Sequence, residues 1–283
     1  MRKVLFFIFF ALTVAAYGQS VIRSGAYINN RSYANGDKSI CFKFSSNNQI
    51  ERFNVDSYDP EEDDLDKLPK KNRLTGTYRI NNENGIDFIT IQWNNKTTAR
   101  YLLLLLPDGT PFLYTSDSQP YFSGISTSNW EYLGNRPEFG NEKWVKASSS
   151  LTEGKTSFST DKLGIKIGEC WAEGGKGYGI GETLTLSIVQ GNNLTISNGF
   201  VSFSKPYLYR ENARIKKIRI TNMEGKSEVV TLRDTPHFQE INSALITYSA
   251  EGPVITKLEI LEVYPGSKYE DTCVNSIFYR FSQ

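Results

Sequence analysis

Hydrophobic and polar residues alternate along much of the chain, and few stretches show the spacing of a helix. Four strand-like segments lie in the first half, at residues 75–80, 87–93, 99–106 and 111–116. Period-two alternation predicts half-buried β-strands, and the turns between them, which contain Asn, Asp and Gly, are typical of antiparallel hairpins. We therefore expect an antiparallel β-meander in this half, either an open sheet or a small up-and-down barrel.

Shorter alternating runs fill the second half. The apolar residues that alternate or nearly alternate with polar ones are Ile196, Ile218, Ile220, Val230, Leu232, Leu258, Ile260 and Val263. The two facing sheets of a β-sandwich require this pattern. Residues 126–143 are rich in Gly, Ser, Asn and Pro, so we expect a linker there. The predicted organisation is all-β, with an N-terminal β-rich domain of unknown function at 19–125 and a second domain at 144–283.

A glycine-rich stretch, GECWAEGGKGYGIGE, runs from Gly168 to Glu182. A phosphate-binding loop needs G-x-G-x-x-G or G-x-x-x-x-G-K-[ST] spacing ahead of a helix, and neither spacing is present. The glycines alternate instead and precede a predicted strand, TLTLSIV. Glycine at every second position suits a tight turn or a close backbone approach. We expect such a turn, covered by the ring of Trp171.

Composition and the first residues bear on where the protein works. The net charge of +1 gives no electrostatic footprint for nucleic acid or an anionic membrane. Residues 1–18 have a basic start at Arg2 and Lys3, an apolar run, and small residues at Ala16 and Gly18. This order predicts a signal peptide cleaved before Gln19 and a secreted or periplasmic protein. The alternative is an uncleaved anchor, but the apolar run is shorter than the roughly 20 residues of a spanning helix, and no later segment is long enough.

Seven segments of the second half occur in one order and carry a family resemblance. They are WVKASSSLTEG at 144–154, FSTDKLG at 158–164, CWAEGGKGYGIGETLTLSI at 170–188, LTISNGF at 194–200, YRENARIKKIRI at 209–220, VTLRD at 230–234 and KYEDTCVNSI at 268–277. Together they resemble the NADase-type glycan-binding domain, the NAD glycohydrolase translocation member of the factor V/VIII type C (discoidin-like) domains. The resemblance implies a galactose-binding-like jelly-roll sandwich whose loops at one end contact carbohydrate.

A sugar site needs a flat aromatic ring for the C–H face of the sugar and planar polar groups for its hydroxyls. The candidate ligand-binding residues are Tyr178, Asn198, Phe200, Tyr207, Tyr209, Asn212, Arg214 and Asp234. Core packing is the alternative for each aromatic residue, and turn or strand-edge contacts are the alternative for each polar one. The expected function is an exported, non-catalytic glycan-binding protein. The alternative is a structural or assembly protein of the cell envelope that binds another protein.

Catalytic equipment is sparse in the sequence. His237 is the single histidine, so a zinc site with two histidines is excluded and a Ser-His-Asp site would have to use it. We expect it to be a surface loop residue. Glu173 and Glu182 are the one carboxylate pair in the distinctive motif, and an enzyme related to NAD glycohydrolases is a further alternative. We expect no catalysis, no cofactor and no metal.

Three cysteines, Cys41, Cys170 and Cys273, allow three pairings with one thiol left over. Cys170 and Cys273 lie at the two ends of the second domain. Discoidin-like domains often join their ends by a disulfide, so the resemblance implies a bridge between these two. Cys41 would then be a buried thiol or an intermolecular contact, and we expect burial.

Overall fold

The fold is taken from a computed structural model. It describes residues 21–29, 39–56, 63, 65, 67–123, 130–132, 145–188, 193–246 and 254–280. Among these residues the helical elements are short, namely η2 (Thr160–Lys162) and α2 (Leu208–Glu211), and strands dominate. The all-β prediction is confirmed. No helix in the described part of the chain is long and apolar enough to cross a membrane.

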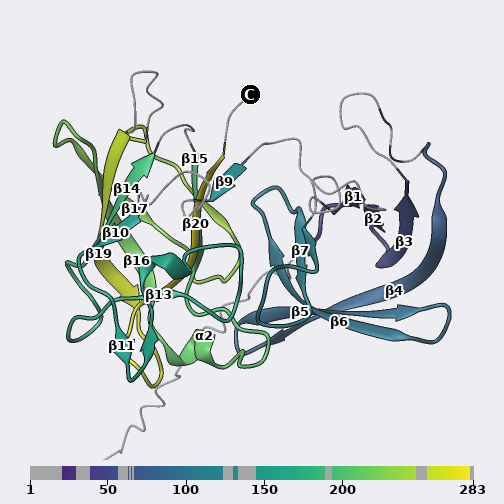
Figure 1. The fold of residues 1–283 in the computed structure, drawn as a ribbon, viewed down its shortest axis with the longest axis horizontal. Helices are drawn as coiled ribbons and strands as arrows, with labels where there is room; N and C mark the ends of the chain where they lie inside the picture. The colour runs from purple at the N-terminus through teal and green to yellow at the C-terminus, as the bar shows by residue number, and fades with distance from the viewer. Residues whose placement is uncertain are drawn as a thin grey trace, which may run out of the picture.

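The first half forms one sheet of eight antiparallel strands in which each strand pairs with the next in sequence. The strands are β1 (Gly25–Ile28), β2 (Ser39–Phe44), β3 (Gln49–Val55), β4 (Lys71–Glu83), β5 (Ile86–Trp93), β6 (Thr98–Leu105), β7 (Pro111–Tyr114) and β8 (Phe122–Ser123). This is the predicted meander (Figure 1). Asn84 and Gly85, both with positive φ, make the tight turn between β4 and β5.

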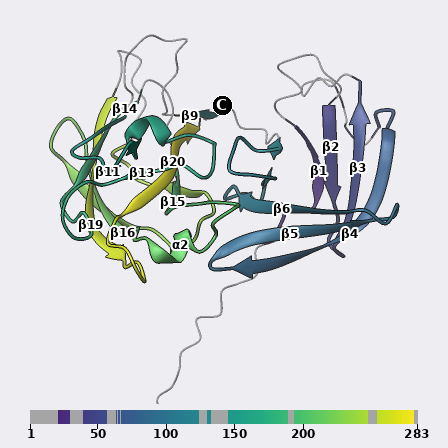
Figure 2. The same ribbon diagram turned by 60° about the horizontal axis from the view of Figure 1, so that its bottom comes forward.

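The sheet is strongly curved, and its two edges come close together. Figure 2 shows β1, β2 and β3 running across the direction of β4, β5 and β6. At the edges, the Asn29 side chain donates from Nδ2 to the carbonyl of Tyr121 over 3.1 Å. We call the concave side the inner face. Its buried core consists of Ile22, Tyr27, Phe42, Phe44, Ile50, Ile89, Ile91, Trp93, Tyr101, Leu103, Leu105, Leu113 and Phe122.

The second half is a two-sheet sandwich, as predicted. One sheet has the order β10-β14-β19-β16-β17 and the other β13-β20-β15-β18, while β11 (Thr152–Glu153) and β12 (Thr156–Ser157) form a separate hairpin. The sheet strands are β10 (Val145–Ala147), β13 (Trp171–Ala172), β14 (Thr183–Ile188), β15 (Asn193–Asn198), β16 (Arg214–Thr221), β17 (Ser227–Thr231), β18 (Gln239–Ile241), β19 (Val254–Tyr264) and β20 (Cys273–Arg280). Leucine, isoleucine and valine side chains from both sheets pack around the buried ring of Trp171.

Part of the predicted linker belongs to the sandwich. Within residues 126–143, Trp130–Tyr132 form strand β9, which pairs with Phe278–Arg280 of β20. The other residues of that stretch lie outside the described residues. The expected signal peptide at 1–18 also lies outside them, so it stays a prediction.

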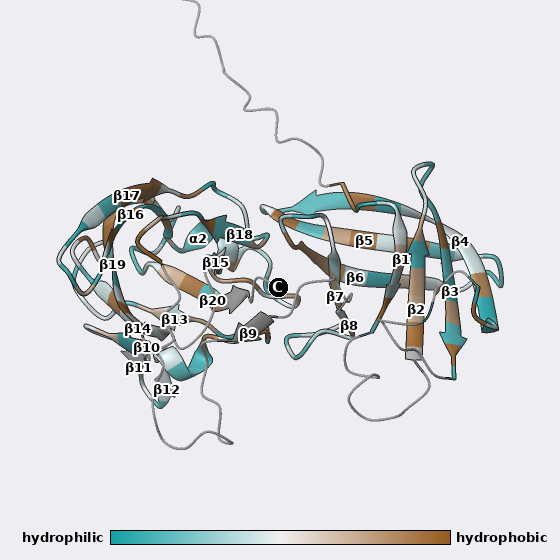
Figure 3. Ribbon diagram, turned by 90° about the horizontal axis from the view of Figure 1, so that it is seen from above, coloured by the Kyte–Doolittle hydropathy of each residue, from teal (hydrophilic) through white to brown (hydrophobic). Residues whose placement is uncertain are grey.

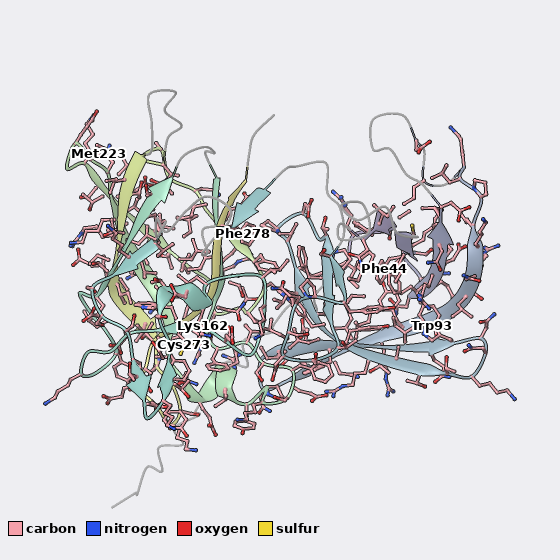
Figure 4. All side chains as sticks on the ribbon, in the orientation of Figure 1. Phe44, Trp93, Lys162, Met223, Cys273 and Phe278 are labelled. Atoms are coloured by element: carbon pink, nitrogen blue, oxygen red, sulfur yellow. The ribbon has the colours of Figure 1, made fainter. Side chains whose placement is uncertain are left out.

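A third buried cluster joins the two halves. Its buried members from the first half are Ile86, Phe88, Leu102, Leu104, Leu106, Phe112 and Tyr114, and those from the second half are Ile167, Val201, Tyr209, Phe238 and Phe278. Phe238 stands edge-on to both Phe112 and Phe278, with ring centroids 5.2 Å and 5.3 Å apart. Figure 4 shows Phe278 on the side of the sandwich that faces the N-terminal sheet. Because residues from both halves form this core, the N-terminal sheet and the sandwich pack directly against each other.

Candidate functional site

Three of the predicted ligand residues meet at one carboxylate beside α2. Asp234, in the loop between β17 and β18, accepts hydrogen bonds from Nε and Nη2 of Arg214 over 3.1 and 3.0 Å. The hydroxyl of Tyr209 donates to the same carboxylate over 3.0 Å, and Arg210 Nη1 donates over 2.6 Å. Arg210 was not predicted from the sequence, although it directly follows Tyr209. Two guanidinium groups and one phenol therefore surround a single carboxylate.

The electrostatics of this network fix its charges. Burial acts to raise the pKa of Asp234, but the hydrogen bond and charge of Arg214, with the charge of Arg210, lower it overall. Burial raises the pKa of Tyr209 well above its ordinary value, and the negative Asp234 raises it further. Asp234 is therefore a carboxylate and Tyr209 a neutral phenol at neutral pH.

The same network is internal to the fold. Tyr209 is fully buried and Arg214 is 4% exposed. The β4–β5 turn of the N-terminal sheet covers it: a Cβ placed on Gly85 would lie 2.6 Å from Arg210 Nε and 2.7 Å from Tyr209 Cδ1. These side chains therefore hold the two halves together. We expected Tyr209 and Arg214 to contact a ligand. Their burial corrects this expectation, because a ligand cannot reach side chains that the fold covers.

Asn198 and Asn212 also support the backbone. Asn198 is buried and bonds both backbone groups of Ile215, accepting from the N–H over 3.0 Å and donating to the carbonyl over 2.7 Å. Asn212 donates to the carbonyl of Leu208 over 2.9 Å and so closes the C-terminal end of α2. For both residues the structure therefore shows the strand-edge and turn contacts that the sequence left as the alternative.

The three remaining aromatic candidates do not converge on Asp234. Phe200 is half-buried and packs against the cluster formed by Cys170, Ala172 and Cys273. Tyr178 is half-buried in the glycine-rich loop, where its carbonyl accepts a hydrogen bond from Thr272 Oγ1 over 2.8 Å. Tyr207, at the start of α2, is 44% exposed. Of the eight predicted residues, Tyr207 is thus the aromatic one that is open to a ligand.

A second exposed tyrosine lies on the neighbouring loop and was missed from the sequence. Tyr269 is 38% exposed, and its backbone N–H donates to the carbonyl of Glu211, the last residue of α2, over 2.8 Å. Lys268 lies 4.8 Å from the centroid of the Tyr269 ring. The stretch KYED signals a polar loop, but the exposure of its tyrosine depends on how this loop docks on α2. Tyr207 directly precedes α2 and Tyr269 is bonded to its last residue, so the two lie at opposite ends of this short helix. Figure 1 shows α2 at one end of the sandwich.

The glycine-rich stretch is a set of tight turns at this same end. Gly177, Gly179 and Gly181 all have positive φ, and a Cβ on Gly179 would lie 2.5 Å from Glu173 Cγ. Only glycine fits such a position without strain. Trp171 is buried beside the turns and donates from Nε1 to the carbonyl of Ser149 over 3.0 Å. The prediction of a tight turn is confirmed, but the ring of Trp171 packs in the sandwich core, and the side chain that lies against Gly179 is Glu173.

The two glutamates of the motif have different surroundings. Glu182 accepts hydrogen bonds from the hydroxyls of Ser148 and Ser149. Glu173 is fully buried and accepts from the N–H of Gly175 over 2.7 Å, while its Oε1 has no hydrogen-bond partner among the described residues. Burial raises the pKa of Glu173, backbone hydrogen bonds lower it, and the negative Asp271 and Glu182 raise it again, with a net rise.

The three cysteines are buried, and no disulfide joins any two of them in the described structure. The expected bridge between Cys170 and Cys273 is therefore absent from it, although both residues belong to one buried cluster. Cys41 is buried, as expected. Within the described ranges, no three His, Cys, Asp or Glu side chains are grouped in a way that could hold a metal ion.

His237 lies in a loop, as predicted, but not on the open surface. Its side chain is 16% exposed and its Nε2 lies 3.1 Å from Asp87 Oδ2 of β5. The expectation of an exposed residue is wrong because the N-terminal sheet covers this loop, which also donates the N–H of Phe238 to the carbonyl of Leu105.

The fold and the loop arrangement define the second half as a factor V/VIII type C, discoidin-like β-sandwich. Residues 138–280 match the family model of the NAD glycohydrolase translocation F5/8 type C domain. The chain belongs to this family.

Other comparisons are distant. No curated protein matches the sequence significantly. Two cryo-electron-microscopy structures of the arabinofuranosyltransferase AftD from Mycobacteria align at 12% identity with TM-scores of 0.34 and 0.33, over 62% of this chain. The chain spans 13% of the length of that transferase. A structure from a study of carbohydrate-binding modules of the β-sandwich superfamily aligns at 12% identity and a TM-score of 0.29, over 86% of this chain and 97% of its own. Scores this low do not establish a shared fold.

Proposed function

We propose that the protein binds glycan through the end of the sandwich that carries Tyr207 and Tyr269. The observation that carries the proposal is the exposure of these two rings at the two ends of α2, 44% and 38%. Exposed tyrosine combines a flat apolar face for a sugar ring with a hydroxyl that bonds to sugar hydroxyls. Lys268 supplies a further donor beside the ring of Tyr269.

The internal network supports this surface. Asp234, Arg214 and Tyr209 bind one another beneath α2, and Tyr269 is bonded through its backbone to Glu211 at the end of α2. Because these contacts hold α2 and the backbone of Tyr269 in place, this surface loses little conformational freedom when a ligand binds, which favours affinity. Family membership is consistent with a binding role, since the matched model describes an F5/8 type C domain that is named for translocation and not for catalysis.

We propose that the role is non-catalytic. The carboxylate of Glu182 accepts serine hydroxyls and that of Glu173 a backbone amide within the turns. His237 is occupied at the junction of the two halves, between Asp87 and the backbone of Leu105. These contacts give each candidate catalytic group a structural task.

We also propose export after cleavage before Gln19, which the order of basic, apolar and small residues at 1–18 supports. In an oxidising compartment Cys170 and Cys273 are the pair placed to form a disulfide, because both lie in one buried cluster, whereas Cys41 packs with Phe53 in the N-terminal sheet. Peptide mapping of exported protein without reductant tests both statements. A mature N-terminus at Met1, or both thiols free, would contradict them.

The proposed function is tested with the full mature chain on a glycan array, followed by titration with the strongest sugar. A shallow single-sugar site predicts a Kd in the millimolar to micromolar range, roughly −4 to −8 kcal/mol. Tyr207→Ala and Tyr269→Ala should each weaken binding about fivefold or more without changing the unfolding temperature, because both rings are exposed. Met223→Ala, which alters a 69% exposed side chain on the β16–β17 turn, is the matched control and should bind as the wild type does.

Two results would overturn the proposal. One is a blank array together with a stable protein partner recovered from envelope extracts, which would favour an assembly role. The other is sugar binding that survives both tyrosine substitutions.

A further inference from the structure

An arginine interrupts the apolar inner face of the N-terminal sheet. On β3, Ile50 belongs to the inner core, whereas Phe53 and Val55 belong to a separate cluster on the opposite face. Arg52 therefore shares the inner side with Ile50, because side chains alternate along a strand. Its direct partners across the sheet are Phe42 on β2 and Leu74 on β4. Both are apolar and pack in the inner core.

The guanidinium of Arg52 is incompletely paired. Its Nε is buried and has no hydrogen-bond partner in the described structure. Burying a charged donor without a partner is costly. Two arginines on the outer side of the same sheet are paired with carboxylates: Arg73 Nε lies 2.5 Å from Glu51, and Arg100 Nη2 lies 2.7 Å from Glu83. Among the described residues, the positive charge on the inner face therefore lacks the acidic partner that Arg73 and Arg100 have.

The same inner core contains a buried phenol. Tyr101, on β6, is buried in the inner core, and its ring stacks with that of Tyr121 at 5.5 Å between centroids. Burial raises the pKa of Tyr101 to about 12, while the positive charge of Arg52 acts to lower it, so the two groups interact electrostatically. The neutral phenol can donate a hydrogen bond. The inner core therefore contains a charged side chain, Arg52, and the neutral phenol of Tyr101 among its apolar residues.

The apolar surface around Arg52 is not completely covered. Leu74, Tyr78 and Ile80 lie on the inner side of β4, with Gly76 between the first two, and remain half-buried against the inner core. The view from above shows the curved sheet with β1, β2 and β3 facing β4, β5 and β6 (Figure 3). Curved sheets of eight up-and-down strands are of a size to enclose one small ligand.

We propose that the inner face of the N-terminal sheet binds a free alkyl carboxylate, with its head group on Arg52 and its chain along Leu74, Tyr78 and Ile80. Charge complementarity selects this occupant, because in the described part of the face Arg52 is a cation without a carboxylate partner within an apolar surface. A carboxylate accepts the fork of N–H donors of a guanidinium, and a linear chain fits along one strand. This site is separate from the glycan surface on the second half and does not depend on it.

The test is isothermal titration of the full mature chain with dodecanoate, and with dodecanol as the uncharged control, both below the concentrations at which they aggregate. Dodecanoate should bind about ten times more tightly than dodecanol. Arg52→Gln should weaken dodecanoate about ten- to hundredfold, the usual effect of losing a hydrogen bond to a charged group, and leave dodecanol unchanged. Arg73→Gln, at an exposed arginine on the outer side of β4, should change neither affinity.

A measurement on the wild type keeps the test decisive if Arg52→Gln does not fold. With dodecanoate labelled with ¹³C at the carboxyl, the bound resonance should titrate at lower pH than the free acid, because a guanidinium favours the ionised form. The proposal is overturned if the bound carboxyl titrates as the free acid does, if dodecanoate does not bind, if dodecanol binds equally well, or if folded Arg52→Gln binds dodecanoate as the wild type does.

Discussion

The imidazole of His237 bridges the two halves of the protein. Its Nε2 lies 3.1 Å from Oδ2 of Asp87 on β5, although 150 residues separate the two in sequence. Its Nδ1 accepts the backbone N–H of Leu105 over 3.3 Å, which places the ring proton on Nε2, where it is donated to Asp87. The other carboxylate oxygen of Asp87 accepts from Asn82 Nδ2 over 2.7 Å. The single histidine of the chain thus has a defined tautomer and a structural role.

This contact should contribute measurably to the stability of the whole chain. We expect His237→Gln and Asp87→Asn each to lower the free energy of unfolding, with a coupling of about 1–2 kcal/mol in the double-mutant cycle, since both side chains are largely buried. Urea unfolding followed by tryptophan fluorescence measures it. Lys226→Gln, an exposed residue of the β16–β17 turn, serves as a control for effects of side-chain replacement. Additive effects of the two substitutions would contradict the bridging role.

Substitution of Asp234 should change how stability depends on pH. The folded-state pKa of Asp234 is lowered, so its contribution is present above the unfolded value of about 3.9 and is lost as pH falls through the folded value. Asp234→Asn leaves the buried Arg214 without its carboxylate and should cost about 3–5 kcal/mol at neutral pH. The difference from the wild type should shrink below about pH 4.

Thermal unfolding between pH 2 and pH 7 measures this dependence for the Asp234 variant. Asp161→Asn, at an exposed aspartate in η2, is the control and should leave the curve unchanged. A cost of Asp234→Asn that stays constant across this range would show that the carboxylate charge is not what Asp234 contributes.

The strands were readable from the sequence where one face is apolar and the other polar. Residues 75–80 lie in β4 on this basis, where exposed and half-buried positions alternate. The run YLLLLL at 101–106 does not alternate, and the structure shows why. Leu103 and Leu105 enter the inner core, while Leu102, Leu104 and Leu106 enter the cluster shared with the sandwich. A strand that is buried on both faces lacks the alternation that predicts a strand. Its continuous apolar run indicates instead that both faces of the sheet are covered.

The candidate site was harder to predict, because the exposure of a side chain depends on distant parts of the chain. Tyr209 and Arg214 have the chemistry of a sugar site, and they do meet Asp234. What buries them is the β4–β5 turn at Gly85, more than 100 positions away, which no local pattern around α2 reveals. Tyr207 and Tyr269 are equivalent to Tyr209 as residue types, and only the docking of their loops makes them exposed.

Glu173 should destabilise the protein as pH rises, the opposite of Asp234. Its folded-state pKa is raised by burial, so its contribution is fully favourable below the unfolded value of about 4.3 and is lost as pH rises through the folded value. The difference in unfolding temperature between Glu173→Gln and the wild type should therefore move in favour of the variant between pH 4 and pH 7. Glu153→Gln, at an exposed glutamate of β11, should show no such trend. A difference that does not change with pH would mean that the buried carboxyl is compensated by a partner.

The thiol of Cys41 should be inert in the folded protein. It is fully buried on the outer face of β2 beside Phe53, and burial raises its pKa to about 12, although the charge of Lys70 acts to lower it. Only the thiolate reacts with an alkylating reagent, and at pH 8 this group is protonated as well as inaccessible. Iodoacetamide at pH 8 should therefore label Cys41 only after the protein is unfolded in guanidinium chloride. Peptide mass spectrometry of labelled native and unfolded samples measures the difference, and the exposed cysteine of a Ser116→Cys variant confirms that the reagent is active. Labelling of native Cys41 at a rate near that of the introduced cysteine would show that the outer face of β2 opens readily, and that the Phe53 cluster does not protect it.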